Sequence, residues 1–244
     1  MIRLVRAELL KLFTTRLLLW LGLLILALSA FVTSTRIAST SHGELARVSE
    51  QRSIVQFAAV GTLIALIVGI VAIAGEYAHG TIDHTFLVSP RRERVVTAKL
   101  VAAAMTGVAV TLFAEAVTYL VAALWISSKS VPFELTSRPV WTTYATTLAA
   151  AALSGALGTG VGALVRRQTA AIVLALIWLL VGEPVLAIAG VQAYAPGHAI
   201  AAVVAANSRS GELLGPWPGT ALALAYVGVF AAAGTLMVVR SDVA

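Results

Sequence analysis

Glu76 and His79 are the first residues whose types and spacing could support chemistry. Lying three positions apart, they would share one face of a helix, as a pair of metal ligands or an acid and a base must. Gly80 follows at once, however, and no second pair completes a metal site. We therefore expect a turn at this point and no metal centre.

The sequence also lacks the motifs of enzymes that bind nucleotides or cleave bonds. It has no GxxxxGK[ST] loop, and none of Lys11, Lys99 and Lys129 follows a glycine. Neither GxSxG nor HExxH occurs. Cysteine is absent, which excludes disulfides and thiolate chemistry. The chain is predicted not to be an enzyme by itself and to bind no metal or cofactor.

Two carboxylates, Glu115 and Glu183, lie inside long apolar runs. A carboxylate in lipid is costly unless it faces protein or water, so both must have a special environment. Two interpretations stay open for each residue. It lines a substrate path or gate, or it pairs with a neighbouring span.

The elements that position these residues are predicted from composition. Hydrophobic residues make up 59% of the 244 residues, charged residues 11%, and the mean hydropathy is +0.94, which indicates an integral membrane protein. Its formal charge of +6 comes from basic residues at the ends of apolar runs, which argues against nucleic acid as a partner. We expect an all-α fold with one transmembrane domain over residues 1–244. Six apolar runs are long enough to cross a bilayer: 17–35, 54–74, 98–126, 140–165, 169–188 and 219–239.

The topology follows from the even number of spans, which leaves both termini on one side. That side carries 11 of the 17 Lys and Arg residues, an excess that is typical of the cytoplasm. The sequence therefore predicts a multi-pass protein of the plasma or inner membrane with both termini cytoplasmic.

Residues 1–16 are predicted to form an amphipathic helix that lies along the membrane surface. Arg3, Arg6 and Lys11 alternate with apolar residues such as Leu9, so that basic and apolar faces separate. The simpler alternative is a basic flank of the first span.

A stripe of small residues occurs in the fourth span, where Ser154, Gly158 and Gly162 recur every four positions. Such a stripe lets helices pack closely in a membrane. Whether it packs inside the subunit or across a dimer is left open.

The polar segment 75–97 interrupts the apolar runs after Glu76. Gly80 and Thr81 stand where a helix would stop, since glycine accepts a left-handed terminal conformation at least cost.

A short helix is expected after this turn. Ile82 and Phe86 would share its apolar docking face, whereas Asp83 would point elsewhere. Three basic residues then return the chain to the membrane surface: Arg91, Arg92 and Arg94.

The segment 189–218 is predicted to be external. It contains Pro196, Pro216, Pro218 and an apolar run, 199–206, that is too short to cross the bilayer. Such a run is re-entrant or lies on the outer surface.

Several of these segments resemble ABC type-2 transporter permeases. The most specific is Glu76-Tyr-Ala-His-Gly-Thr81, followed by Pro90-Arg-Arg and Ala98-Lys-Leu100; Ala7–Leu12 is similar to the opening of the same family. The resemblance covers residues 7–242 in order.

It implies that the short helix is a coupling helix, seated in a separate ATP-hydrolysing subunit that binds ATP and Mg²⁺. Its coupling residues would be Glu76, His79, Gly80, Thr81, Ile82, Asp83 and Phe86. It also implies re-entrant external helices between spans five and six, and an exporter. Six spans enclose too little volume for a path, so we expect two ATPase copies with a second permease copy or a related permease.

The alternative is a secondary transporter or channel that uses Glu115 or Glu183 directly. Against it, only the fifth span carries an internal proline, so paired broken helices are missing.

Overall fold

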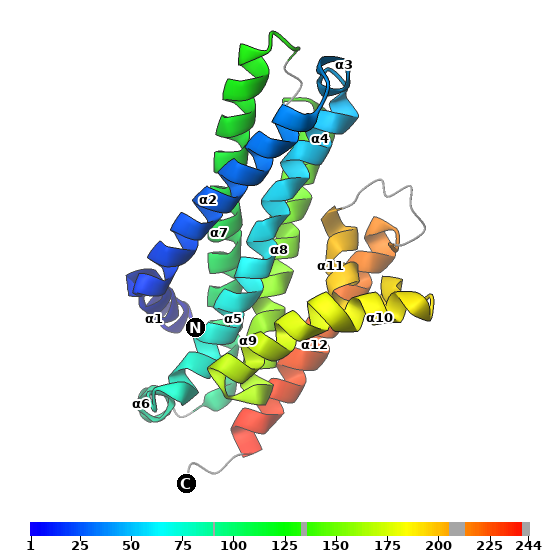
Figure 1. The fold of residues 1–244 in the computed structure, drawn as a ribbon. Helices are drawn as coiled ribbons and strands as arrows, with labels where there is room; N and C mark the ends of the chain where they lie inside the picture. Colours follow the sequence, from blue (N-terminus) through cyan, green and yellow to red (C-terminus); the bar gives the residue numbers. More distant parts are fainter. Residues whose placement is uncertain (90, 133–135, 205–212, 241–244) are drawn as a thin grey trace.

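The computed structural model describes residues 1–89, 91–132, 136–204 and 213–240. Within these ranges the chain is helical and contains no β-strand, as predicted. Six spans in the described residues are long and apolar enough to cross a membrane (Figure 1): Arg16–Ser39, Val48–Ala78, Arg92–Ser128, Arg138–Val165, Gln168–Ile188 and Pro216–Arg240.

Four spans are single helices: α2 (Arg16–Ser39), α7 (Arg92–Ser128), α8 (Arg138–Val165) and α12 (Pro216–Arg240). The second span joins α4 (Val48–Gln56), the short 3-10 helix η1 (Phe57–Ala59) and α5 (Val60–Ala78). The fifth joins α9 (Gln168–Ile177), the π-helix η2 (Trp178–Gly182) and α10 (Glu183–Ile188). Shorter helices connect them: α1 (Ile2–Thr14), α3 (His42–Leu45), α6 (Ile82–Val88), the 3-10 helix η3 (Gln192–Tyr194) and α11 (Pro196–Val204).

The centre of the bundle is formed by α5, α7 and α8, which pack against one another. The most hydrophobic stretch of the second span is 61% buried, whereas that of the fifth is only 11% buried. The apolar faces of α2, α9, α10 and α12 therefore look outward, as they would toward lipid or another subunit.

The small-residue stripe of α8 faces α5 inside the subunit. A Cβ atom added at Gly158 would lie 2.1 Å from the carbonyl oxygen of Leu66, and one at Gly162 would lie 2.8 Å from that of Ile70. Backbones at this separation leave no room for a side chain, so glycine is required. Ser154, the third member of the stripe, lines a cavity described below.

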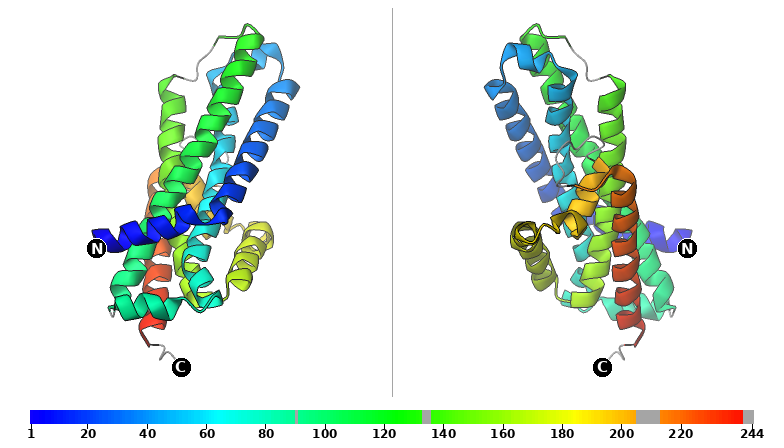
Figure 2. Two further views of the ribbon diagram at one scale, coloured as in Figure 1. Left: turned by 90° about the vertical axis from the view of Figure 1, so that its left-hand side faces the viewer. Right: turned by 90° about the vertical axis from the view of Figure 1, so that its right-hand side faces the viewer.

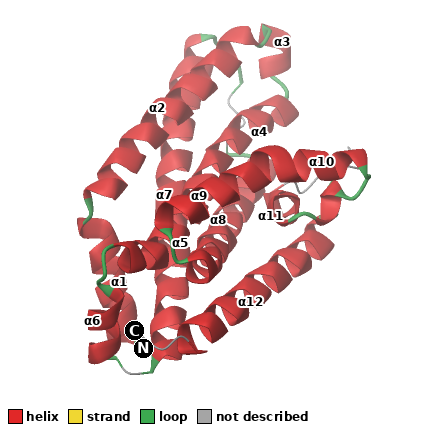
Figure 3. Cartoon of the chain, turned by 60° about the horizontal axis from the view of Figure 1, so that its bottom comes forward, coloured by secondary structure: helices red, strands yellow, loops and turns green. Residues whose placement is uncertain are grey.

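One end of the bundle collects α1, α6 and the C-terminal end of α12. Lys11 of α1 contacts Glu76 of α5, and Arg92 of α7 donates to the carbonyl of Val238 in α12. α1 lies across the long axis of the bundle (Figure 2) and close to α6 and the N-terminus (Figure 3). The even number of spans thus brings both ends of the described chain to one side.

Span five is bent where Trp178–Gly182 forms the π-helix and Pro184 follows it. Proline has no amide hydrogen to donate, and a π-helical turn shifts the hydrogen-bond pattern by one residue. Beyond the bend, α11 packs on α8 and α12. The helix α11 covers the first part of the short apolar run that was predicted to be re-entrant or surface-lying; residues 205 and 206 of that run lie outside the described residues.

Candidate functional site

The turn after α5 has the structure that Gly80 predicts. Gly80 adopts φ +65°, in the left-handed region that favours glycine. The amide of Thr81 donates to the carbonyl of Glu76 at 2.9 Å, and that of Gly80 donates to Tyr77 at 3.3 Å. This pair of bonds is the Schellman motif, which satisfies the last carbonyls of a helix. It sets the direction in which α6 leaves the bundle.

Four charged residues meet at this turn, and we call them the charge cluster: Glu8, Lys11, Glu76 and Lys99. The ammonium of Lys99 lies 2.6 Å from Glu8 Oε2, 2.8 Å from Glu76 Oε1 and 3.0 Å from the carbonyl oxygen of Ala72. Lys11 Nζ lies 2.8 Å from Glu8 Oε1 and 2.8 Å from Glu76 Oε1. Two carboxylates and two ammonium groups thus balance in charge.

The cluster is largely shielded from solvent. Lys99 is fully buried and Glu8 is 5% exposed, whereas half of the Lys11 side chain is accessible. Buried charges are stable only when each is paired and hydrogen-bonded, and here each is. Because Glu8 belongs to α1, Glu76 to α5 and Lys99 to α7, the cluster ties three helices together.

The charge cluster also reaches α6. Thr85 Oγ1 donates to Glu76 Oε2 at 3.2 Å and receives a long bond, 3.4 Å, from Lys11 Nζ. Burial lowers the pKa of Lys11, but hydrogen bonds to Glu76 and Glu8 outweigh this effect and raise the pKa above its ordinary value of 10.5. Lys11 therefore stays charged and keeps α1 in contact with α5 and α6.

Glu8, Lys99 and Thr85 were not among the predicted site residues. A signal for Lys99 existed, since it is a lysine in the first turn of the predicted span 98–126. A lysine there is expected either to extend to the membrane surface or to pair with an acid. Nothing in the sequence identified Glu8 of α1 as its partner.

The faces of α6 differ from the prediction. Ile82 is only 6% exposed, and Phe86 is half-buried beneath the guanidinium of Arg92, 5.1 Å from the ring centre. These two residues pack on the protein itself, so the expectation that they form the exposed docking face is wrong. The reason is that the turn at Gly80 directs this apolar face back onto α7 and α12. The outer face of α6 instead carries Asp83, His84 and Leu87.

His79, the remaining predicted coupling residue, is exposed at the end of α5. Its Nδ1 atom lies 2.7 Å from the carbonyl oxygen of Gly75, one helical turn back. The ring therefore caps its own helix, and Glu76 turns to the charge cluster. The structure does not join the pair as two ligands.

The basic residues of this end have two environments. Arg3, Arg6, Arg91 and Arg94 are exposed. Arg92 is half-buried and donates to the carbonyl oxygen of Val238 at 3.0 Å.

A second arginine, Arg166 at the left-handed end of α8, donates to the carbonyl oxygen of Met237. Cations at a helix C-terminus are favoured by the helix dipole, and so Arg92 and Arg166 together hold the end of α12. Pro90, quoted above for the family resemblance, lies outside the described residues.

Glu183 is 3% exposed, and its carboxylate has three partners in the described chain. Its carboxylate accepts hydrogen bonds from the amide of Gly197 at 2.6 Å and from Trp178 Nε1 at 3.2 Å, and it lies 2.8 Å from His198 Nδ1. The first and last of these groups belong to the start of α11, where amide groups point outward and favour an anion. Glu183 therefore attaches α11 to the bend of span five.

Glu115 has a different environment in α7. It is 4% exposed, and its Oε1 atom has no hydrogen-bond partner among the described residues. No hydrogen bond links it to Glu183, and neither carboxylate lines the apolar cavity between the second span, α8, α9, α11 and α12. The structure thus gives Glu183 a tethering contact, and it does not join the two acids by a hydrogen bond.

Comparison with protein families matches residues 4–212 to the family described as ABC-2 family transporter protein. The match includes most of α1 and all of α6, the charge cluster, the first five spans and α11. Comparison with curated proteins gives no significant match. The matched part covers well over half of the chain, so the protein belongs to the ABC-2 transporter family as a multi-pass, membrane-spanning permease subunit.

Proposed function

We propose that this chain is the permease half of an exporter in which a separate ATPase subunit docks on α6. The observation that carries the proposal is the outer face of α6: Leu87 is 79% exposed beside Asp83 and His84, at the end of the bundle where α1 lies. An apolar side chain with polar neighbours is typical of the centre of a protein–protein interface.

The inner face of α6 supports the same role. Thr85 binds Glu76, and Phe86 packs under Arg92, so α6 is attached to α5 and α7 at two points. A force applied to α6 would therefore be passed to two central spans and, through the charge cluster, to α1. ATP and Mg²⁺ would be bound by the partner, which is expected in two copies.

We expect assembly with a second permease copy or with a related permease, and the exposed spans support this expectation. Span five is only 11% buried within its own subunit, and its outward residues include Leu180, 74% exposed. Native mass measurement of the intact complex tests this stoichiometry. A complex of one permease with one ATPase would contradict it.

The orientation proposed here places both termini, α1 and α6 in the cytoplasm. The chain has no cysteine, so Arg6→Cys creates a single labelling site on an exposed residue. It should react with an impermeant thiol reagent only after the cells are opened. Labelling of intact cells from outside would show that the termini are external and would contradict the proposed orientation.

Co-purification of the ATPase with Leu87→Asp tests the docking face. An unpaired carboxylate in the interface should cost about 2–5 kcal/mol, which is about thirtyfold to several thousandfold in affinity. Ser49→Asp, an exposed change in α4 at the other end of the span, is the matched control. Equal ATPase recovery with the two variants would overturn the docking role.

Phe86→Asp should act differently, because Phe86 faces the protein itself. We expect it to lower the thermal stability of the isolated permease, whereas Leu87→Asp leaves that stability unchanged. Comparing both properties separates a lost interface from a misfolded subunit.

A further inference from the structure

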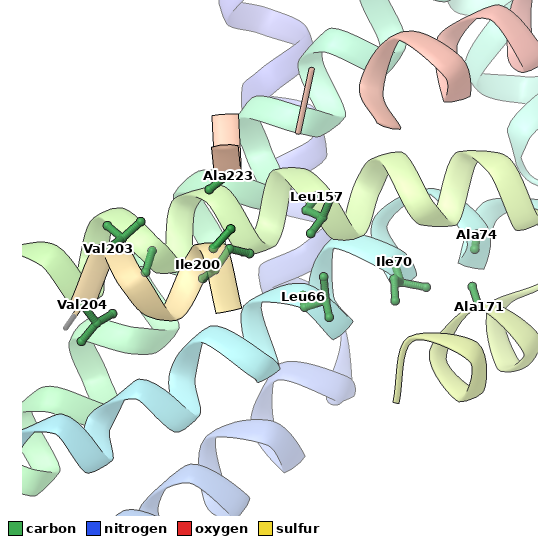
Figure 4. Packing of buried hydrophobic residues seen from close by; sticks show 11 residues of the cluster. Leu66, Ile70, Ala74, Leu157, Ala171, Ile200, Val203, Val204 and Ala223 are labelled. Atoms are coloured by element: carbon green, nitrogen blue, oxygen red, sulfur yellow. The ribbon is translucent and has the colours of Figure 1, made fainter. Parts of the chain in front are cut away.

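A cavity of about 730 Å³ lies between the second span, α8, α9, α11 and α12. Its walls are mostly aliphatic and aromatic, and none of its described lining side chains is charged. Figure 4 shows Leu66, Leu157 and Ile200, from α5, α8 and α11, directed toward the same space. This volume and this lining are typical of a site for a small apolar ligand, and exposed lining residues such as Leu174 show that the cavity is open on one side.

Two polar groups in the wall lack partners within the described chain. The Trp178 indole binds Glu183, and the Tyr226 hydroxyl donates to the carbonyl oxygen of Tyr194 at 2.7 Å. Among the described residues, neither the amide of Gln56 nor the hydroxyl of Ser154 makes a hydrogen bond. The cavity therefore offers a long apolar surface together with an amide and a hydroxyl that are free to bind a ligand.

The wall formed by α11 is held in place by Glu183. The Gly197 amide donates to this carboxylate, and Gly197 also lines the cavity. A Cβ atom at Gly197 would lie 2.6 Å from Glu183 Oε2, so the contact requires glycine. The buried carboxylate thus adds a polar contact at the start of α11, whose apolar face packs on α8 and α12.

The position of the cavity decides the chemistry of its occupant. The cavity lies among membrane spans, where the surrounding solvent is hydrocarbon. Water is not a favourable occupant, because an apolar wall offers it few hydrogen bonds. We propose that it binds the alkyl chain of a lipid-like amphiphile, with Gln56 and Ser154 available to its polar groups. That this amphiphile is the transported molecule rests on the proposed function; the binding site itself does not.

Photolabelling of the full chain in lipid vesicles tests the site. The probes are a phosphatidylcholine with a photoreactive diazirine midway along one acyl chain and a fatty acid with the same group. We expect both to label residues of the cavity wall, mapped by mass spectrometry. Labels confined to outward side chains such as Leu180 would overturn the proposal.

Variants that fill the cavity with a large side chain test whether the probe binds there. Ala201→Phe introduces a ring from α11 and Ala175→Phe introduces one from α9, so either can serve if the other misfolds. Each should reduce labelling of the wall by about tenfold or more, the effect of losing one large apolar contact. Ala232→Phe, on an exposed position of α12 that does not line the cavity, should leave labelling unchanged. Undiminished labelling in both filled variants would refute the site.

The labelling experiment uses the permease without the ATPase, so its outcome does not depend on whether an ATPase docks on α6. In the assembled complex, the probe is irradiated after a period of ATP turnover. Weaker labelling of the wall would identify the amphiphile as a transported molecule, because unreacted probe has left the site. Unchanged labelling would identify a resident lipid, and both outcomes keep the alkyl-chain site. If ATPase binding survives Leu87→Asp while labelling succeeds, the docking proposal fails and the cavity proposal stands.

Discussion

Replacing Lys99 by methionine is the most direct test of the charge cluster, because methionine keeps an unbranched side chain and removes the ammonium group. Lys99 is fully buried, and its Nζ atom contacts Glu8, Glu76 and the carbonyl oxygen of Ala72 at 2.6, 2.8 and 3.0 Å. Its loss leaves two carboxylates with one ammonium. Removing one partner of a buried ion pair costs about 3–5 kcal/mol, and we expect Lys99→Met to lower the free energy of unfolding by this amount.

Lys11→Met is the matched control, since it removes the same group from the same two carboxylates. The Lys11 side chain is 48% exposed, so solvent screens its contacts and the loss should be at most about 1 kcal/mol. In a chain of this size, 1 kcal/mol shifts the unfolding midpoint by about 2–4 °C. Thermal unfolding in one detergent should therefore show a decrease of about 6–20 °C for Lys99→Met and at most about 4 °C for Lys11→Met.

A combined variant tests the charge balance itself. Glu8→Gln added to Lys99→Met again leaves one carboxylate and one ammonium, so part of the lost stability should return. Equal midpoints for the two lysine variants, or a further decrease in the combined variant, would refute the reasoning that burial and charge balance stabilise this joint.

Three further outcomes are expected. Gly80→Val should lower the free energy of unfolding by about 1–3 kcal/mol and uncouple ATP hydrolysis from transport, because valine strongly disfavours a φ of +65°. Gly80→Asn should be tolerated, since asparagine adopts this conformation more readily. Equal activity of the two variants would contradict this prediction. Gly158→Ala should destabilise the bundle by about 1–3 kcal/mol, measured by thermal unfolding, because the added Cβ atom would clash with the Leu66 carbonyl oxygen. Gly22→Ala is the control: a Cβ atom there would have no neighbour within 4 Å, so this change should be neutral or stabilising. Because the pKa of Lys11 is raised, its contribution to folding stability is complete below pH 10.5 and is lost as the pH rises through the raised pKa. Hydrogen exchange of α1 in the native chain should accelerate over that pH range. The Lys11→Met variant should show no such acceleration.

Much of the fold could be predicted from hydrophobicity alone. The apolar runs had to form helices because a backbone in lipid must satisfy its own hydrogen bonds, and their lengths decide which of them span. The stop after α5 was equally local: only a residue such as Gly80 takes a positive φ at little cost, and the Schellman bonds to Glu76 and Tyr77 follow from that conformation.

The partners across the bundle could not be predicted in this way. The contact of Glu8 with Lys99 joins residues 91 positions apart, and it depends on α1 crossing the end of the bundle at one angle. Periodicity gives a helix two faces but does not say which face meets the protein. The pattern of Ile82 and Phe86 is therefore equally compatible with a docking face and a buried face. Packing against the body of the subunit buries Ile82 and half-buries Phe86.

The two membrane carboxylates also show which properties follow from the sequence and which from tertiary packing. Composition alone required that Glu115 and Glu183 be sheltered, because an unpaired charge in lipid is costly. Which group shelters them is a matter of tertiary structure: the bend in span five turns Glu183 toward the amide of Gly197, 14 residues further along the chain, whereas Glu115 lies buried on α7. Local sequence determined where helices begin, end and enter the membrane, and long-range packing decided which polar groups meet, since such contacts depend on the relative positions of whole helices.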